Sequence, residues 1–172
     1  PSAGVRPAAK APAAGAPMLV PATQSTGTRS CSNTSSTPTC AAPRAPGLGT
    51  WITPAMQAAY LRMHELGHAH SVECWREGRL VGGLYGMALG RVFFGESMFA
   101  LETDASKVAL AHLARLLSER GYAIIDCQMT TAHLQSMGAR ELSRAQFVET
   151  LARWVPDGLA AQKWAADAAQ HL

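Results

Sequence analysis

Gly90-Arg91-Val92-Phe93-Phe94-Gly95-Glu96-Ser97-Met98-Phe99 is an apolar run, typical of a buried β-strand, that contains a single carboxylate. Strict alternation along a strand places Glu96 on the same face as Phe94 and Met98, with Phe93 on the other face. Removing an unpaired carboxylate from water is costly. We therefore expect Glu96 to be paired or to lie at the mouth of a pocket.

A second run of the same kind is Ile124-Ile125-Asp126-Cys127-Gln128, which begins apolar and ends polar. Asp126 and Gln128 fall on one face of this predicted strand, and Cys127 falls on the other. Cys127 has the pattern of a small core side chain more than that of a nucleophile. The two runs together predict one site built from two strands.

The remaining chain from residue 50 onward has clear starts and stops for helices and strands. Thr53 and Pro54 are a typical helix start, and Gly67 a typical stop. The order of elements predicts an α+β fold, a mixed sheet flanked by helices of the kind that acyltransferases have. The predicted helices are 53–66, a segment starting at 104 or 106 and ending before 121, 131–137, 143–154 and 159–171; the predicted strands are 71–75, 80–89, 91–98 and 123–127.

Glycines are concentrated in the second predicted strand, at Gly82, Gly83, Gly86 and Gly90. A glycine weakens a strand and is kept where a bulge or a close approach requires it. Two explanations stay open with equal weight. Either a ligand comes close to this strand, or a helix packs tightly against it.

Composition divides the chain into three parts. Residues 1–49 hold eight of the ten prolines, four basic residues and no acidic or aromatic residue, which predicts a disordered segment. Residues 50–155 are expected to form the folded domain. Residues 156–172 form an Ala-rich C-terminal tail with the pattern of a peripheral helix. The chain carries a net charge of +3, so residues 50–172 carry −1, and any nucleic acid must be bound by a local patch.

Location and cofactors are constrained by what the sequence does not contain. Its longest apolar run, 81–89, is too short to span a bilayer, and no secretory signal precedes it. The four cysteines show no CxxC spacing, which favours a reducing compartment. We expect a soluble cytoplasmic protein with no cofactor. The chain begins with Pro1 rather than Met, so its first residues are not expected to be a natural start.

One motif suggests a different function, zinc-dependent peptide hydrolysis. His64-Glu65-Leu66-Gly67-His68 matches HExxH, in which two histidines of one helix bind zinc and the glutamate activates water. Gly67 lies near the predicted helix end, and no third ligand is recognisable downstream. We therefore expect no metal site, and a zinc metallopeptidase is the less favoured alternative.

Six motifs together carry a family resemblance: Gly49-Thr50-Trp51-Ile52-Thr53-Pro54, the segment 60–72, Gly82-Gly83-Leu84-Tyr85-Gly86, 92–99, Ala105-Ser106-Lys107 and Ile125-Asp126-Cys127-Gln128. In this order the chain resembles bacterial leucyl/phenylalanyl-tRNA–protein transferases, from about residue 40 to residue 154. The similar part is the family's C-terminal, acetyltransferase-like (GNAT-type) domain. The family's N-terminal FPWF-like and WWSP-like runs have no counterpart here, and residues 1–39 have the composition of a frame-shifted GC-rich gene. If that portion is truly missing, an inactive chain is expected.

The resemblance implies a monomeric enzyme that transfers Leu or Phe, and less readily Met, from Leu-tRNA or Phe-tRNA to proteins with N-terminal Lys or Arg. Such transfer marks the acceptor for degradation by the N-end rule. The resemblance also implies that Trp51 and Tyr60 hold the tRNA 3′ adenosine end through stacking. It implies no membrane partner. The apolar pocket for the aminoacyl side chain would be lined by Leu84, Phe93, Met98 and Ile125.

Catalysis is assigned to Asp126 and Gln128. Gln128 would position the attacking amine while Asp126 polarises it; alternatively, a ribose hydroxyl of the substrate relays the proton. Glu96 would pair with the cationic N-terminus of the acceptor or hold the reacting amine. The competing structural interpretation is a buried polar network that fixes the sheet register.

Overall fold

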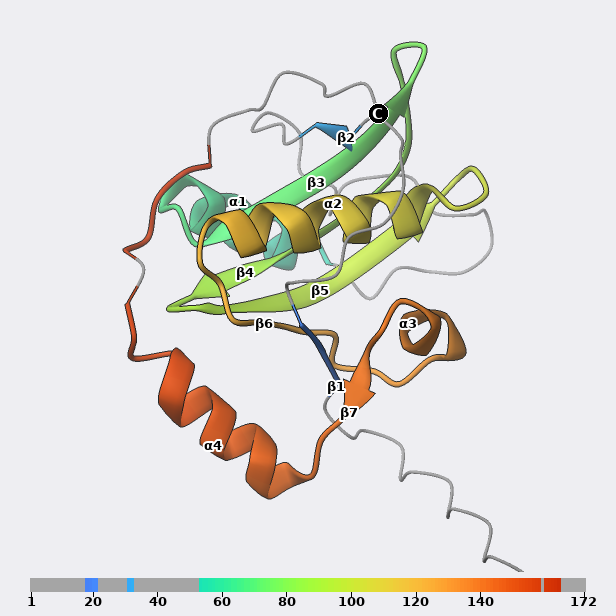
Figure 1. Cartoon of the computed structure of the whole chain (residues 1–172). Coiled ribbons are helices and arrows are strands. Elements are labelled where there is room, and N and C mark those ends of the chain that lie inside the picture. Colours follow the sequence, from blue (N-terminus) through green and yellow to red (C-terminus); the bar gives the residue numbers. More distant parts are fainter. Residues whose placement is uncertain (1–17, 22–30, 33–52, 159, 165–172) are drawn as a thin grey trace, which may run out of the picture.

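The computed structural model describes residues 18–21, 31–32, 53–158 and 160–164. Its helices and strands form an α+β domain (Figure 1), as the order of elements predicts. Among the described residues, no helix is long and apolar enough to cross a membrane. The elements are β1 Met18–Pro21, β2 Cys31–Ser32, α1 Pro54–Glu65, β3 Ala69–Arg76, β4 Arg79–Leu89, β5 Val92–Ala100, α2 Ala105–Glu119, β6 Ile124–Asp126, α3 Ala132–Ser136, β7 Arg140–Glu141 and α4 Arg144–Trp154.

The strands form one mixed sheet in the order β2-β3-β4-β5-β6-β1-β7. Strands β3, β4 and β5 are an antiparallel meander, because each follows the previous one through a short turn. Strand β6 returns after α2 and pairs parallel to β5, which makes the sheet mixed. The mixed sheet flanked by helices is therefore confirmed.

The two main helices lie on opposite faces of the sheet. Helix α2 crosses β3, β4 and β5 on one face (Figure 1) and buries its apolar stripe, including Leu110, Leu113 and Leu117, in the principal core. The smaller cluster on the other face joins Met56 and Tyr60 of α1 to Tyr85. No residue of α1 is fully buried, so this helix covers the sheet less completely than α2.

The predicted helix ends are confirmed where a side chain supplies the cap. Thr53 accepts a hydrogen bond from the Met56 N–H at 3.3 Å, with Pro54 in the first turn. Gly67, with φ of +83°, follows the end of α1. Ser143 and Gln146 form a reciprocal capping box at the start of α4. Asp104 precedes α2 without a side-chain cap bond.

Close packing accounts for two of the strand glycines. A Cβ at Gly82 would lie 2.5 Å from the Ala105 Cβ on α2. A Cβ at Gly86 would meet the backbone oxygen of Phe94 and lie 2.5 Å from the Phe93 ring. A substituent at either position would force β4 away from its neighbours. A tightly packed helix therefore explains Gly82, whereas at Gly86 it is the neighbouring strand β5 that leaves no room for a side chain.

The predicted C-terminal helix is wrong within residues 160–164, which have no regular secondary structure. Trp164 instead inserts into the core, where it is 4% exposed and stacks on His70 at 3.8 Å between ring centroids. Burial of the Trp164 side chain favours a non-helical path for this segment. The helix propensity of its Ala-rich sequence is a weak preference, which tertiary contacts override. The rest of the predicted helix, 159 and 165–171, lies outside the described residues.

Most of the predicted disordered segment, residues 1–49, also lies outside the described residues. The exceptions are β1 and β2. Strand β1 pairs with both β6 and β7 in antiparallel register. Strand β2 pairs with the outer edge of β3. These two short strands extend the sheet at both sides of the central meander.

Candidate active site

The sheet opens where β5 and β6 diverge. Their pairing ends at Phe94 and Asp126, while β5 continues to Ala100 along β4. The chain after β6 leaves the sheet toward α3. The space beside the unpaired half of β5 is a cavity of about 630 Å³, within the range of small-molecule sites.

The cavity has an apolar part and a polar part. Side chains from β4, β5, α2, β6 and α3 supply the apolar wall, in which Leu110, Leu113 and Ile125 belong to the principal core. Carboxylate, amide, hydroxyl and imidazole groups supply the polar wall. The full lining is Leu84, Tyr85, Gly95, Glu96, Ser97, Met98, Leu110, Leu113, Ile125, Cys127, Gln128, Met129, Thr131, His133 and Leu134.

A β-bulge sets the position of Glu96. Tyr85 lies opposite Ser97, and Gly86 lies opposite Gly95, so Glu96 is the extra residue of β5. Its carboxylate accepts a hydrogen bond of 2.9 Å from the Tyr60 hydroxyl on α1. The Tyr60 ring in turn packs edge-on against Tyr85, 5.1 Å between centroids.

The same bulge corrects the predicted faces of β5. Strict alternation separates Phe93 from Met98, but both pack in the α2 core. The extra residue reverses the alternation after Gly95, which brings Met98 opposite Leu84. Glu96 therefore does not share a face with Met98. Its carboxylate is paired with the Tyr60 hydroxyl. This is one of the two outcomes that we expected for a carboxylate in this apolar run.

Asp126 and Gln128 lie in a tight turn at the end of β6. The Gln128 N–H donates a hydrogen bond of 2.9 Å to Asp126 Oδ1. The Met129 N–H donates to the Cys127 carbonyl at 2.6 Å, which closes a three-residue turn around Gln128. Gln128 has φ of +58°, a conformation that costs energy for a non-glycine residue and is concentrated at functional sites.

The Asp126 carboxyl is buried, with 5% exposure. Burial raises the pKa of Asp126 above its usual value, the hydrogen bond from Gln128 opposes this rise, and the Glu96 charge adds to it. A carboxylate with a raised pKa is a better proton acceptor than an exposed one. The two carboxylates are thus electrostatically coupled across the divergence of β5 and β6.

Cys127 is placed for packing rather than for nucleophilic chemistry. Burial, with a smaller effect of Asp126, raises the pKa of its thiol to about 12, which keeps it protonated near neutral pH. Its side chain packs against the principal core. This agrees with the prediction of a small core side chain.

The HExxH segment does not have the geometry of a zinc peptidase. Helix α1 ends at Glu65, so His68 lies beyond the helix that carries His64. Glu65 forms an exposed ion pair with Arg62 at 2.8 Å, and His64 Nδ1 lies 2.7 Å from the Ala69 carbonyl oxygen. Within the described ranges, no three metal-ligating side chains come together. The metallopeptidase alternative therefore has no support.

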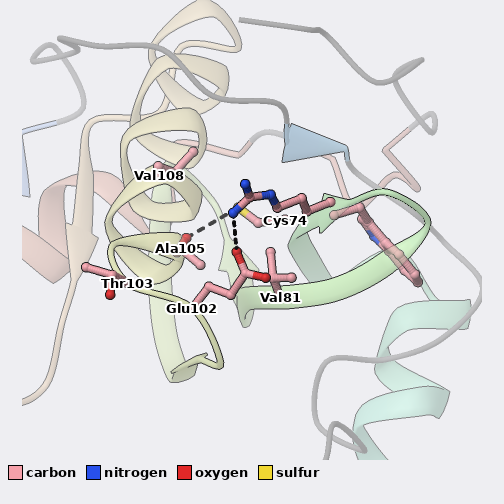
Figure 2. A pocket seen from close by; sticks show the side chains of 8 residues that line it. Cys74, Val81, Glu102, Thr103, Ala105 and Val108 are labelled. Carbon is pink, nitrogen blue, oxygen red and sulfur yellow. Dashed lines mark hydrogen bonds and ion pairs between the residues drawn. The ribbon is translucent and has the colours of Figure 1, made fainter.

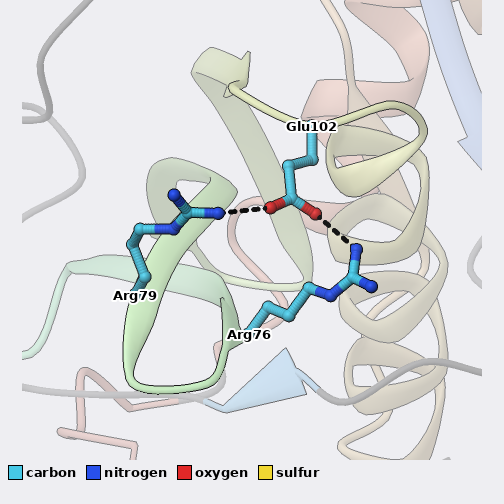
Figure 3. Close-up of polar contacts among 3 residues, drawn as sticks. All are labelled: Arg76, Arg79 and Glu102. Atoms are coloured by element: carbon cyan, nitrogen blue, oxygen red, sulfur yellow. Dashed lines mark hydrogen bonds and ion pairs between the residues drawn. The ribbon is translucent and has the colours of Figure 1, made fainter.

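A second cavity of about 350 Å³ lies between the β3–β4 hairpin and the start of α2 (Figure 2). Glu102 on its wall bridges Arg76 at 3.0 Å and Arg79 at 2.9 Å (Figure 3). The hydrogen bond from Arg76 lowers the pKa of Glu102 below its usual value. Glu102 thus joins the two guanidinium groups of the β3–β4 hairpin to the segment that precedes α2.

Comparisons with known proteins decide the family. The model of the leucyl/phenylalanyl-tRNA protein transferase family matches residues 33–152. This chain belongs to that family. A leucyl/phenylalanyl-tRNA–protein transferase of Azoarcus sp. (strain BH72) is 67% identical over 133 residues, which are 77% of this chain and 57% of the relative. The corresponding protein of Syntrophobacter fumaroxidans is 64% identical over 115 residues, 67% of this chain and 49% of the relative. The chain spans about half the length of the curated relatives it matches.

Most residues predicted from the sequence as the transferase site meet at the cavity. Phe93 is fully buried in the principal core and is not among the residues that line the cavity. Asp126 and Tyr60 adjoin the cavity through their hydrogen bonds to Gln128 and Glu96. Trp51 lies outside the described residues. The predicted residues that line the cavity are Leu84, Glu96, Met98, Ile125 and Gln128.

Sequence reasoning missed the contribution of α2 and α3. Leu110 and Leu113 of α2 belong to the principal core and also line the cavity, which was not predicted from the sequence. His133 and Leu134 enter it from α3, which is too short for its pattern to show a face. Because α3 also holds the polar residues Gln135 and Ser136, the polar character of His133 gives no distinct signal in the sequence.

Proposed function

We propose that this domain transfers an aminoacyl group from aminoacyl-tRNA to the N-terminal amine of a protein. The observation that carries the proposal is the cavity where β5 and β6 diverge, which joins an apolar wall to Glu96 and Gln128. Membership of the leucyl/phenylalanyl-tRNA–protein transferase family supports it. We assign the domain to residues 50–155 and its fold to the GNAT type. In the sequence it lies between the segment 1–49 and the tail 156–172.

The donor side chain fits the apolar wall. Leu113 and Ile125 belong to the core cluster and Met98 packs against it, so these groups present a largely preformed apolar surface. Burying a Leu or Phe side chain there gives about 1.5–3 kcal/mol. We therefore propose Leu-tRNA and Phe-tRNA as donors, with Met transferred less readily.

The chemistry needs placement and proton removal more than activation, because the aminoacyl ester is already reactive. The amine nitrogen attacks the ester carbonyl, a peptide bond forms, and the C–O bond to the ribose breaks. The amine loses a proton and the departing ribose oxygen gains one. Asp126, whose pKa burial raises, is suited to take the proton from the amine while Gln128 orients it. A relay through a ribose hydroxyl remains the alternative route.

The acceptor is proposed to carry an N-terminal Lys or Arg. Glu96 supplies a carboxylate at the cavity wall, held by Tyr60. A cationic group of the acceptor would gain a charge-assisted hydrogen bond from it. Through this specificity the enzyme, acting as a monomer in the cytoplasm, would tag proteins for N-end-rule degradation.

The proposal is tested by incubating the chain with labelled Phe-tRNA and a peptide that begins with Arg. Transfer to this peptide, and none to the same peptide with an acetylated N-terminus, is the expected result. A second protein joins residues 50–172 to the preceding half of the Azoarcus relative. No transfer by either protein would contradict the proposal.

A further inference from the structure

His133 is a polar side chain of the cavity to which the proposed function gives no role. It lies in α3 and lines the cavity wall that follows β6. Its Nε2 is buried and has no hydrogen-bond partner within the described part of the chain. A buried polar atom without a partner costs free energy, so a ligand that supplies the missing bond would be favoured at this point.

The position of His133 is fixed by its neighbours. The Thr131 hydroxyl accepts a hydrogen bond of 3.1 Å from the Leu134 N–H, which holds the first turn of α3. Leu134 itself is 7% exposed and belongs to the principal core. The imidazole therefore lies on a turn that is held in place by packing and a hydrogen bond. Such a fixed position is suited to ligand binding.

An aminoacyl-adenosine end presents three kinds of group to the cavity. Its side chain is apolar and matches the wall formed with α2, and the reacting amines match the Glu96 carboxylate and the Gln128 amide. Its ribose is neutral and hydroxylated. The His133 imidazole can both donate and accept at a neutral hydroxyl, as can the amide and hydroxyl groups of the lining. What favours His133 for this contact is its buried Nε2, which has no hydrogen-bond partner in the described part of the chain.

We infer that His133 is a substrate-binding residue that hydrogen-bonds through Nε2 to the free 2′-hydroxyl of the aminoacyl-adenosine end. The inference rests on the proposed function and adds the contact that recognises the ribose. It also gives the site a means to prefer a ribonucleotide donor over a deoxyribonucleotide, since the 2′-hydroxyl is what distinguishes them.

The test measures binding of amide-linked 3′-phenylalanyl-adenosine and of its 2′-deoxy form by calorimetry. For the unmodified chain, loss of the 2′-hydroxyl should weaken binding roughly five- to tenfold, as expected for one hydrogen bond. His133→Leu should bind both ligands with equal, weakened affinity. His133→Gln, which places an amide nitrogen near the Nε2 position, should restore part of the difference.

Two controls separate the possible failures. Gln135→Ala changes an exposed neighbour on α3 and should leave the ratio of the two affinities unchanged, and thermal unfolding shows whether each variant is folded. The inference is overturned if His133→Leu still distinguishes the two ligands as the unmodified chain does. If the unmodified chain binds neither ligand, the proposed function fails and the inference with it.

Discussion

The Tyr60 hydroxyl donates a hydrogen bond of 2.9 Å to the Glu96 carboxylate, which joins α1 to the bulge of β5. A carboxylate on an extra residue of a strand is less constrained than one in a regular ladder. This bond therefore gives the Glu96 side chain a defined direction. Tyr60 is suited to orient Glu96, whereas the family resemblance assigns it to the adenosine end.

Replacing Tyr60 with Phe separates these two roles. The ring keeps its packing on Tyr85, so we expect a loss of stability of no more than about 1 kcal/mol. If Tyr60 orients Glu96, the kcat/KM for an Arg-terminated acceptor falls roughly tenfold and the KM for Phe-tRNA is unchanged. A rise in the KM for Phe-tRNA alone would instead support the adenosine role.

Asp126→Asn is expected to stabilise the fold while it removes activity. The raised pKa of Asp126 means that its ionised form is disfavoured by folding. Asparagine keeps the acceptor for the Gln128 N–H, so the free energy of unfolding at neutral pH should rise.

The stabilising effect of Asp126→Asn should depend on pH. Since the folded pKa lies above the unfolded value of 3.8, the penalty exists above the folded pKa and disappears as the pH falls to the unfolded one. The advantage of Asp126→Asn, measured by denaturant unfolding, should therefore shrink toward pH 3.8. A stabilising effect of Asp126→Asn that does not change with pH would contradict the raised pKa of Asp126.

His70 should make the fold less stable in acid. Burial, with a smaller effect of His64, lowers the pKa of His70 to about 3 from 6.5. Between these values the unfolded chain binds a proton that the folded chain excludes, so stability falls with pH by at most about 1.4 kcal/mol per unit. His70→Phe keeps a ring against Trp164 and removes the titration. Its stability relative to the unmodified chain should increase from pH 6.5 to pH 3, and parallel curves would refute this.

Local signals made much of the fold predictable. Thr53, Ser143 and Gly67 determine helix ends through bonds and dihedral angles within a few residues. The bulge at Glu96 was not predictable in this way, because it depends on which β4 residue lies opposite. Trp164 likewise leaves the helical pattern for a long-range contact with His70.

Site residues were predictable where a carboxylate interrupts the apolar sequence of a strand. Glu96 and Asp126 each interrupt an apolar run, and both lie where β5 and β6 separate. Leu113 and His133 were missed, because their contribution depends on how α2 and α3 pack against that opening. Sequence periodicity shows which side of a helix is apolar, but not which part of that side faces a cavity.

The most direct test of the account is a crystal structure of this chain with amide-linked 3′-phenylalanyl-adenosine. We expect the phenyl ring to contact Leu113 and Ile125, and the α-amine to lie within hydrogen-bonding distance of Glu96 or Gln128. Ligand bound instead in the cavity beside Arg76 and Glu102 would contradict this expectation.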